Sequence, residues 1–319
     1  MSGASYLITR QESAIMNPEK SEKRVLSRRS VMAAGMVGMA GALLTRGPVA
    51  AADTDMFNAN DPASVLRAVT RMRYSEDGRL TMGWLKARRF GVVDAEITPL
   101  FGMVTGTFGR HRVMSDGSVE NVSFELAFYT DLESGEVLDT IKIPYTNKTV
   151  KVPRLLLGPS KSRTLPVFYD LKTWSAPSEV DAASTAAMRP AGSSRVEEWL
   201  GPVTVKNDDI WIVQASSAIR IPTDPTARKV VYSEALSNTA KYADLLNTNL
   251  PSIQSKLGYT GISSWRPWME MGDHPGHTTS SGFGDRAFQL DDLPDDYRAM
   301  AERYYPEALA NPGAILDRA

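Results

Sequence analysis

The sequence predicts a mainly β protein of the β-rich α+β type, in which an antiparallel meander forms a barrel or a sandwich with short peripheral helices. Between residues 90 and 170, runs rich in Val, Ile, Thr and aromatic residues recur with a spacing of about ten residues, which is typical of consecutive antiparallel strands. Turn signals such as Asp116-Gly117 and Ser134-Gly135 separate these runs. No internal repeat or low-complexity tract interrupts the pattern.

The N-terminal segment has the parts of a twin-arginine export signal. Arg28-Arg29 precedes the apolar run Val31–Leu44, and the small residues Val49–Ala52 form a cleavage site. A spanning helix needs about 20 mostly apolar residues, and this run is shorter and broken by glycines, so we expect no stable membrane anchor. The sequence therefore predicts that residues 1–52 are a cleaved leader. It predicts a periplasmic protein, exported by the twin-arginine translocase, with a single β-rich domain over residues 53–319.

The first element of this domain is a predicted helix. Asp61 is a suitable N-cap and Pro62 a suitable first helical residue. Apolar residues then recur at helical spacing on one face, at Val65, Leu66, Val69 and Met72.

Six strands are predicted next, over residues 90–97, 100–112, 119–130, 137–143, 149–157 and 165–169. Residues 115–118 and 131–136 are predicted hairpin turns. Because side chains alternate along a strand, Phe124, Leu126 and Phe128 share one face and Glu125, Ala127 and Tyr129 share the other. If the Phe face packs in the core, Glu125 and Tyr129 face either solvent or the lumen of a barrel. In a lumen they would be an acid–base pair, with the pKa of Glu125 raised by burial.

The second half of the domain is predicted to begin with a long surface excursion over residues 176–195. Strands resume over residues 203–206, 210–216, 218–221 and 230–235, and a short helix covers residues 239–246. The following part is predicted to be irregular up to a final helix over residues 293–304, which Pro306 ends.

Composition excludes several classes of protein. The chain has no cysteine, so it has no thiolate nucleophile, iron–sulfur cluster or cysteine-ligated zinc. The chain has 36 Lys and Arg residues and 37 Asp and Glu residues. Because the predicted domain has no basic cluster, we expect no nucleic-acid partner. The GxSxG elbow, the Walker loop, the dinucleotide-binding fingerprint and the CxxCH haem motif are also missing from the sequence. We expect no cofactor.

Three segments behind the leader resemble the bacterial DUF1838 family, whose function is unknown. They are the hairpin Phe128–Leu138, the following Pro144–Asn147, and the tryptophan-rich Ser264–Gly272. The resemblance would cover most of residues 60–310, and its most specific part is the tryptophan-rich segment. Leu132 stands where the family usually has Pro, and Ile141 and Ile143 stand where Trp and Asn are common, so the chain resembles a divergent member. The resemblance implies the fold and the export more than a function.

Two of the three histidines, His274 and His277, lie in a Gly- and Pro-rich segment that follows Trp265 and Trp268. Histidine is the usual general acid–base at neutral pH, and Asp273 is placed to orient a ring. The alternative is an exposed loop with two solvated imidazoles. A metal bound by this pair would need a third ligand such as Glu270 or Asp273, and we expect no metal.

Two further groups are candidate ligand-binding residues. Arg110 and His111 belong to a cationic run, which either binds an anion or is a solvated strand edge. Trp265, Trp268 and Trp211 either line a cavity for a flat apolar molecule or are core and rim residues.

The sequence therefore favours an exported, cofactor-independent acid–base enzyme, a lyase or an isomerase, that acts on a small aromatic, phenolic or otherwise apolar molecule. His274, His277, Asp273, Glu125 and Tyr129 are its candidate catalytic residues. The alternatives are a periplasmic binding protein without catalysis and an accessory or structural protein.

Overall fold

A computed structural model describes residues 57–166, 179–180, 194–220 and 230–319. Most of these residues form strands, namely β1 (Asp77–Val93), β2 (Glu96–Val113), β3 (Val119–Thr130), β4 (Thr140–Lys142), β5 (Thr149–Lys151), β6 (Leu155–Thr164), β7 (Glu179–Val180), β8 (Ser194–Lys206), β9 (Asp209–Arg220), β10 (Val230–Lys241), β11 (Ser255–Ser263) and β12 (His277–Ala287). The helices are α1 (Pro62–Arg73), α2 (Tyr242–Leu246), α3 (Asp295–Tyr304), α4 (Pro306–Ala310) and α5 (Pro312–Leu316), with the 3₁₀ turns η1 (Pro267–Met269) and η2 (Leu290–Asp292). None of the helices in these described ranges is long and apolar enough to span a bilayer.

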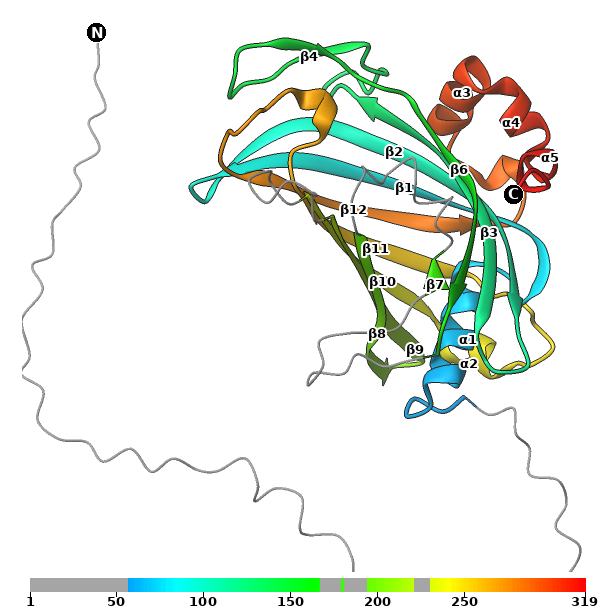
Figure 1. Ribbon diagram of the computed structural model, residues 1–319. Helices are drawn as coiled ribbons and strands as arrows, with labels where there is room; N and C mark the ends of the chain where they lie inside the picture. The colour runs from blue at the N-terminus through cyan, green and yellow to red at the C-terminus, as the bar shows by residue number, and fades with distance from the viewer. Residues whose placement is uncertain (1–56, 167–178, 181–193, 221–229) are drawn as a thin grey trace, which may run out of the picture. The chain divides into compact units, whose positions relative to one another are not determined.

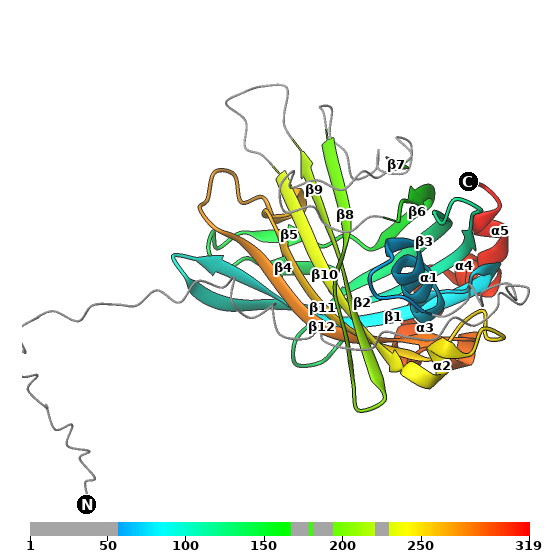
Figure 2. The same cartoon turned by 90° about the horizontal axis from the view of Figure 1, so that it is seen from below.

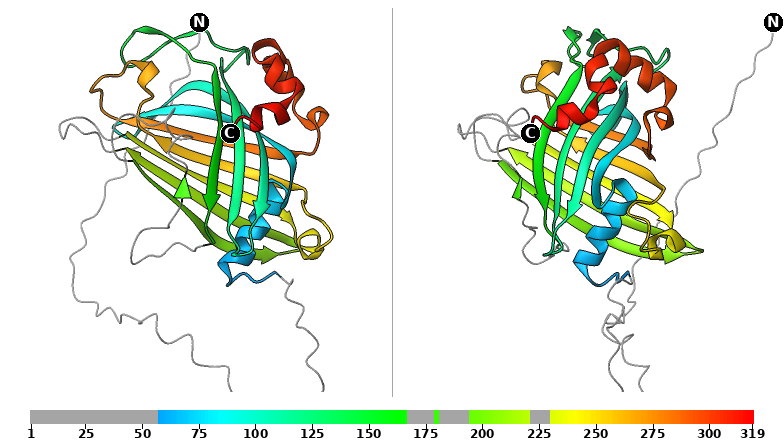
Figure 3. Two further views of the ribbon diagram at one scale, coloured as in Figure 1. Left: turned by 45° about the vertical axis from the view of Figure 1, so that its right-hand side comes forward. Right: turned by 90° about the vertical axis from the view of Figure 1, so that its right-hand side faces the viewer.

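Ten strands form one antiparallel sheet in the order β7-β6-β3-β2-β1-β12-β11-β10-β9-β8, and β4 and β5 form a separate hairpin (Figure 1). The sheet grows from β1 through β2, β3 and β6. The chain then returns from β8 to β12, and β12 pairs with β1. The predicted mainly β, antiparallel meander is confirmed. The sheet is strongly curved (Figure 3), and within the described ranges its outer strands β7 and β8 do not pair, so it is not closed into a barrel.

Several sequence-based boundaries hold and others are wrong. Strand β3 has the predicted bounds, and Asp61 caps α1 by accepting bonds from the amides of Ala63 and Ser64. Strand β1 covers Asp77–Val93 rather than residues 90–97. It ends at Val93 because Asp94 and Ala95, with φ angles of 50° and 66°, make the turn into β2. The predicted excursion and the predicted strand 165–169 lie largely outside the described residues.

The largest error concerns β11 and β12, which were predicted to be irregular because they are rich in Gly, Ser and Thr. Both are inner strands of the sheet, paired on each side. Gly282 and Gly284 of β12 lie so close to β1 that an added Cβ would overlap the carbonyl oxygens of Lys86 and Trp84. Glycine is therefore used here for close strand approach, not for a turn.

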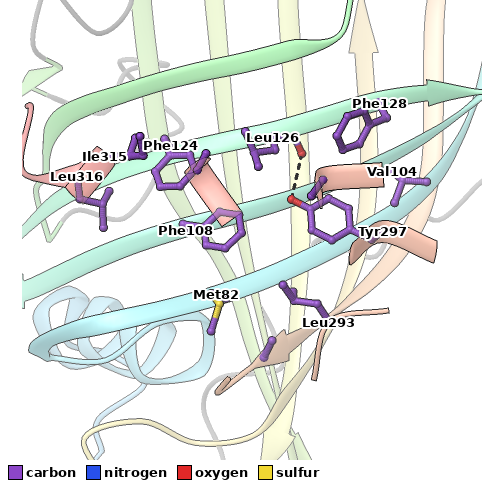
Figure 4. Packing of buried hydrophobic residues seen from close by; sticks show 13 residues of the cluster. Met82, Val104, Phe108, Phe124, Leu126, Phe128, Leu293, Tyr297, Ile315 and Leu316 are labelled. Carbon is purple, nitrogen blue, oxygen red and sulfur yellow. Dashed lines mark hydrogen bonds between the residues drawn. The ribbon is translucent and has the colours of Figure 1, made fainter. Parts of the chain in front are cut away.

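The convex face of the sheet packs against the C-terminal helices (Figure 4). Phe124, Leu126 and Phe128 of β3 point into this cluster, as the alternation predicted. Tyr297 of α3 is fully buried there, and its hydroxyl donates to the carbonyl oxygen of Leu126 at 3.5 Å. Because the Phe face is the core face, Glu125 and Tyr129 point to the concave side.

The two ends of the concave side are each covered by a separate part of the chain, which we call a plug (Figure 2). At one end α1 contacts β3 as well as β8, β9 and β10, and its Val65, Leu66, Val69 and Met72 are buried. At the other end the β4–β5 hairpin and the segment around η1 form a second cluster with Phe101 and Tyr129. The space between the two plugs is where a ligand site is expected.

Candidate functional site

A cavity of about 170 Å³ lies on the concave side of the sheet. Alternate residues of facing strands line it, as the two-residue period of a strand requires. They include Thr105 and Thr107 of β2, Glu125, Ala127 and Tyr129 of β3, and Tyr232, Glu234, Leu236 and Asn238 of β10. Strands far apart in the sheet order, β3 and β10, thus face each other across one space because the sheet curves.

Most of the cavity wall is apolar. Six aliphatic or thioether side chains contribute to it, from β1, β2, β6, β10 and β11, namely Leu85, Met103, Leu155, Leu157, Leu236 and Leu257. The polar part of the lining includes four arginines and the carboxyl groups of Glu125, Glu234 and Asp285.

Glu125 is the carboxyl group whose acidity the cavity changes most. Its side chain is half-buried, and removal from water together with the negative charge of Glu234 raises its pKa to about 7. A hydrogen bond from Thr105 and the positive charge of Arg266 oppose this rise. Near neutral pH the Glu125 carboxyl is therefore divided between its protonated and its ionised forms, as a general acid–base requires.

Glu234 faces the same cavity from β10 and is held by two hydroxyl groups. Tyr232 donates to its Oε2 at 2.5 Å, and Ser216 donates to its Oε1 at 3.4 Å. Burial, first of all, and the neighbouring Glu234 charge raise the pKa of Tyr232 well above its ordinary value. The same two causes raise the pKa of Tyr259, so both phenols stay protonated and act as hydrogen-bond donors.

The four arginines that line the cavity are Arg73, Arg89, Arg266 and Arg286. Arg89 of β1 is 2% exposed, and its Nη1 donates to Ser263 and Thr278, each at 3.2 Å. Arg266 follows β11 and lies over the ring of Tyr232, with its guanidinium carbon 5.1 Å from the ring centroid. Burial and then the positive charge of Arg266 lower the pKa of Arg89, and both arginines line the same cavity.

The histidine segment lies elsewhere. His274 is half-buried, with its Nδ1 2.9 Å from the carbonyl oxygen of Pro275 and its ring 5.4 Å from that of Tyr145. His277 is the first residue of β12, opposite Val92, and Asp273 is exposed. None of these three residues lines the cavity. Within the described ranges, no group of three or more His, Cys, Asp or Glu side chains is placed to hold a metal ion.

The two tryptophans of the same segment support the cavity from outside. Trp265 is buried, and its Nε1 donates to the carbonyl oxygens of His274 and Pro275 at 3.2 and 3.1 Å. Trp268 packs 5.2 Å from the ring of Tyr129, which itself lines the cavity. Trp268 thus fixes the orientation of a cavity residue.

Trp211 does not join this group. It lies half-buried on β9 opposite Thr239, between the fully buried Ile210 and Ile212, and does not line the cavity. Its buried neighbours pack in the cluster around α1.

The predicted pair Arg110 and His111 is separated by the alternation of β2. Arg110 bonds Asp317 beyond α5 at 2.5 Å, whereas His111 is buried and stacks on Tyr74 with ring centroids 3.4 Å apart. Burial, followed by the charges of Arg73 and Arg286, lowers the pKa of His111 well below its ordinary value. Strand β2 lies between β1 and β3, so this run is not a sheet edge.

Sequence reasoning found Glu125 and Tyr129 but missed Arg89, Arg266, Tyr232 and Glu234. A signal existed for the last two, because Tyr232, Glu234 and Asn238 place polar groups on one face of a strand whose other residues up to Ala240 are small or apolar. No local signal pairs either arginine with Glu125, which is remote from both in sequence.

Comparison with known protein families confirms the resemblance over the C-terminal part of the chain. Residues 227–319 match DUF1838, a family described as protein of unknown function. The match includes Tyr232, Glu234, Tyr259 and Arg266, whereas Glu125 and Arg89 lie outside it. No curated protein matches the chain.

Proposed function

We propose that this protein binds a small, single-ring molecule in the concave cavity and moves a proton on it with Glu125. The observation that carries the proposal is a carboxyl group with a pKa of about 7 in an apolar cavity that also holds hydrogen-bond donors. This combination supports a lyase or an isomerase, because both reactions need a base that gains and returns a proton without a change of oxidation state.

Cavity size supports a ligand of one ring. An apolar cavity of about 150 Å³ accommodates benzene, and this one measures about 170 Å³. The walls of Leu, Met and Tyr side chains favour an aromatic or phenolic ring over a sugar, whose hydroxyl groups would lose their hydrogen bonds to water.

The proposed step uses the chain's own groups. Ionised Glu125 removes a proton from a ligand carbon next to a conjugated carbonyl group, and the electron pair of the broken C–H bond moves onto the carbonyl oxygen. Tyr259, Tyr232, Arg89 and Arg266 are the groups that stabilise negative charge in this cavity. In an isomerase, protonated Glu125 returns the proton to a second carbon of the ligand. In a lyase, the carbonyl re-forms, a carbon–carbon double bond forms, the bond from the next carbon to the leaving group breaks, and protonated Glu125 gives its proton to the departing fragment.

Proton exchange tests this proposal before the substrate is identified. The purified protein is incubated in D₂O with a panel of phenols and aryl ketones, and loss of ligand C–H signals is followed by NMR. We expect at least one compound to exchange faster with the wild type than with Glu125→Gln. Glu120→Gln is the matched control, because Glu120 lies on the same strand but is exposed.

The same experiment separates the alternative. Compounds that bind with no exchange, and with equal affinity for wild type and Glu125→Gln, would identify a binding protein without catalysis.

We also propose that the protein acts in the periplasm after twin-arginine export. Support comes from Arg28-Arg29 with its apolar run. Replacement of Arg28 and Arg29 by Lys should retain the protein in the cytoplasmic fraction of the expressing cells. Unchanged recovery from the periplasmic fraction would contradict this localisation.

A further inference from the structure

We propose that the ligand carries a carboxylate group, which Arg89 and Arg266 bind together, so that the substrate class is a single-ring aromatic acid. The inference deepens the proposed function and rests on it, because it concerns the same cavity.

Arg89 is a buried cation without an anionic partner among the described residues. Its Nη1 is bonded only to the neutral hydroxyls of Ser263 and Thr278, and its Nη2 is 4.0 Å from the sulfur of Met103. The Nε atom of Arg89 is buried and has no hydrogen-bond partner in the described part of the chain. A buried charge is costly unless it is paired, so this side chain is suited to receive an anion.

Arg266, which lines the same cavity, also lacks a hydrogen-bond partner for part of its guanidinium group among the described residues. Its Nε atom is also buried without a hydrogen-bond partner among the described residues, and its guanidinium group packs on the face of Tyr232. Like charges close together repel each other, and an anion placed between them converts the repulsion into attraction. Arginine binds carboxylates in a planar, two-pronged geometry.

The three carboxyl side chains that line this cavity do not serve as the anionic partner of the two arginines. Glu234 receives hydrogen bonds from Tyr232 and Ser216. Glu125 is the acid that Arg266 influences, but its pKa of about 7 means that it is often uncharged near neutral pH. Asp285, the third carboxyl of the lining, receives a bond from Gln254 at 2.7 Å and a bond from the amide of Arg286.

The chemistry of the remaining wall limits the rest of the ligand. Leu155, Leu157 and Leu257 offer only apolar surface, and the volume admits about one ring. A ring with one carboxylate therefore matches both the charged and the apolar parts of the cavity.

Benzoate and benzamide are the probes, because they have nearly the same shape and differ in charge. We expect benzoate to bind the wild type at least about tenfold more tightly than benzamide in isothermal titration calorimetry at pH 7. Arg266→Met and Arg89→Met should each abolish this preference. Arg88→Met should preserve it, because Arg88 is exposed on the opposite face of β1.

Equal affinity for the two probes, or a benzoate preference that survives in Arg266→Met, would overturn the carboxylate site while leaving proton exchange by Glu125 intact. Failure of both probes to bind would also overturn the carboxylate site, whereas the proton-exchange experiment tests the proposed function separately. If Arg89→Met does not fold, Arg266→Met decides the question, because Arg266 is only half-buried.

Discussion

The hydroxyl of Tyr232 donates a 2.5 Å hydrogen bond to Oε2 of Glu234, two residues further along the same strand. Residues separated by two positions share one face of a strand, so both side chains enter the concave cavity. The bond keeps Glu234 in the role of acceptor, and the charge of Glu234 helps to raise the pKa of Glu125 on the facing strand. The acidity of Glu125 thus depends on a carboxyl group more than 100 residues away in sequence.

Removal of the Tyr232 hydroxyl should destabilise the protein. We expect Tyr232→Phe to lower the free energy of unfolding by about 1.5–3 kcal/mol, the range for a hydrogen bond to a charged group. Tyr145→Phe is the control, because the buried hydroxyl of Tyr145 has no hydrogen-bond partner in the described part of the chain. Urea unfolding of both variants checks this prediction, and an equal loss of stability in the two variants would contradict it.

Glu125 should make the folded protein less stable as the pH rises. Its pKa is about 7 in the folded protein against an ordinary value of 4.5, so folding favours its protonated form. The contribution of this group is neutral below about pH 4.5, becomes unfavourable between about pH 4.5 and 7, and reaches at most about 3 kcal/mol above that range.

Glu125→Gln should remove this dependence. Relative to wild type, we expect the variant to gain stability progressively between pH 5 and pH 8 in urea unfolding. Glu120→Gln, on the same strand, should run parallel to wild type. A constant difference between Glu125→Gln and wild type across this range would show that the Glu125 pKa is not raised.

The packing of helix α3 on strand β2 should depend on glycine at position 106. A methyl group at Gly106 would overlap the phenol ring of Tyr297, which is fully buried. We expect Gly106→Ala to cost about 1–3 kcal/mol or more of unfolding free energy, as overpacking of a core does. Thermal unfolding is the measurement. In Gly258→Ala the nearest atom would be 3.6 Å away, an ordinary contact, so this control should retain the wild-type melting temperature.

Arg71 should stabilise the packing of α1 at its end of the concave side. This arginine is buried and donates to the carbonyl oxygens of Leu245, Asn247 and Leu250 at 2.8, 2.6 and 2.8 Å. Arg71→Met leaves these acceptors without the donor, and we expect a loss of about 3 kcal/mol or more, because hydrogen bonds to a charged group contribute about 1.5–3 kcal/mol each.

The control for Arg71 is an exposed arginine with an ion pair. Arg79 bonds Asp77 at the surface with 58% of its side chain exposed, so Arg79→Met should cost less than about 1 kcal/mol. Chemical denaturation compares the two variants. A similar loss in both would mean that the carbonyl contacts of Arg71 do not stabilise the plug.

Local sequence predicted the elements whose determinants are local. The cap Asp61-Pro62 and the apolar spacing that follows specify α1, and Asp116-Gly117 specifies the turn between β2 and β3. The alternation of Phe124, Leu126 and Phe128 with Glu125 and Tyr129 predicted both faces of β3. These features act over a few residues through backbone geometry and period.

Strands β11 and β12 escaped prediction because their stability comes from their neighbours. Gly282 and Ser280 have weak strand preferences, yet inner strands gain hydrogen bonds on both sides, and tertiary pairing outweighs propensity. For the same reason His277, predicted in a loop, begins a strand.

The sequence by itself determined that Glu125 and Tyr129 share one face of their strand, opposite Phe124, Leu126 and Phe128, and that the chain contains no thiol. Only the tertiary structure decided that this face is concave, and that Arg89, Tyr232, Glu234 and Arg266 meet Glu125 there. The physical reason is that sheet curvature arises from pairings between distant strands, and a pKa depends on the burial and charges that those pairings bring together.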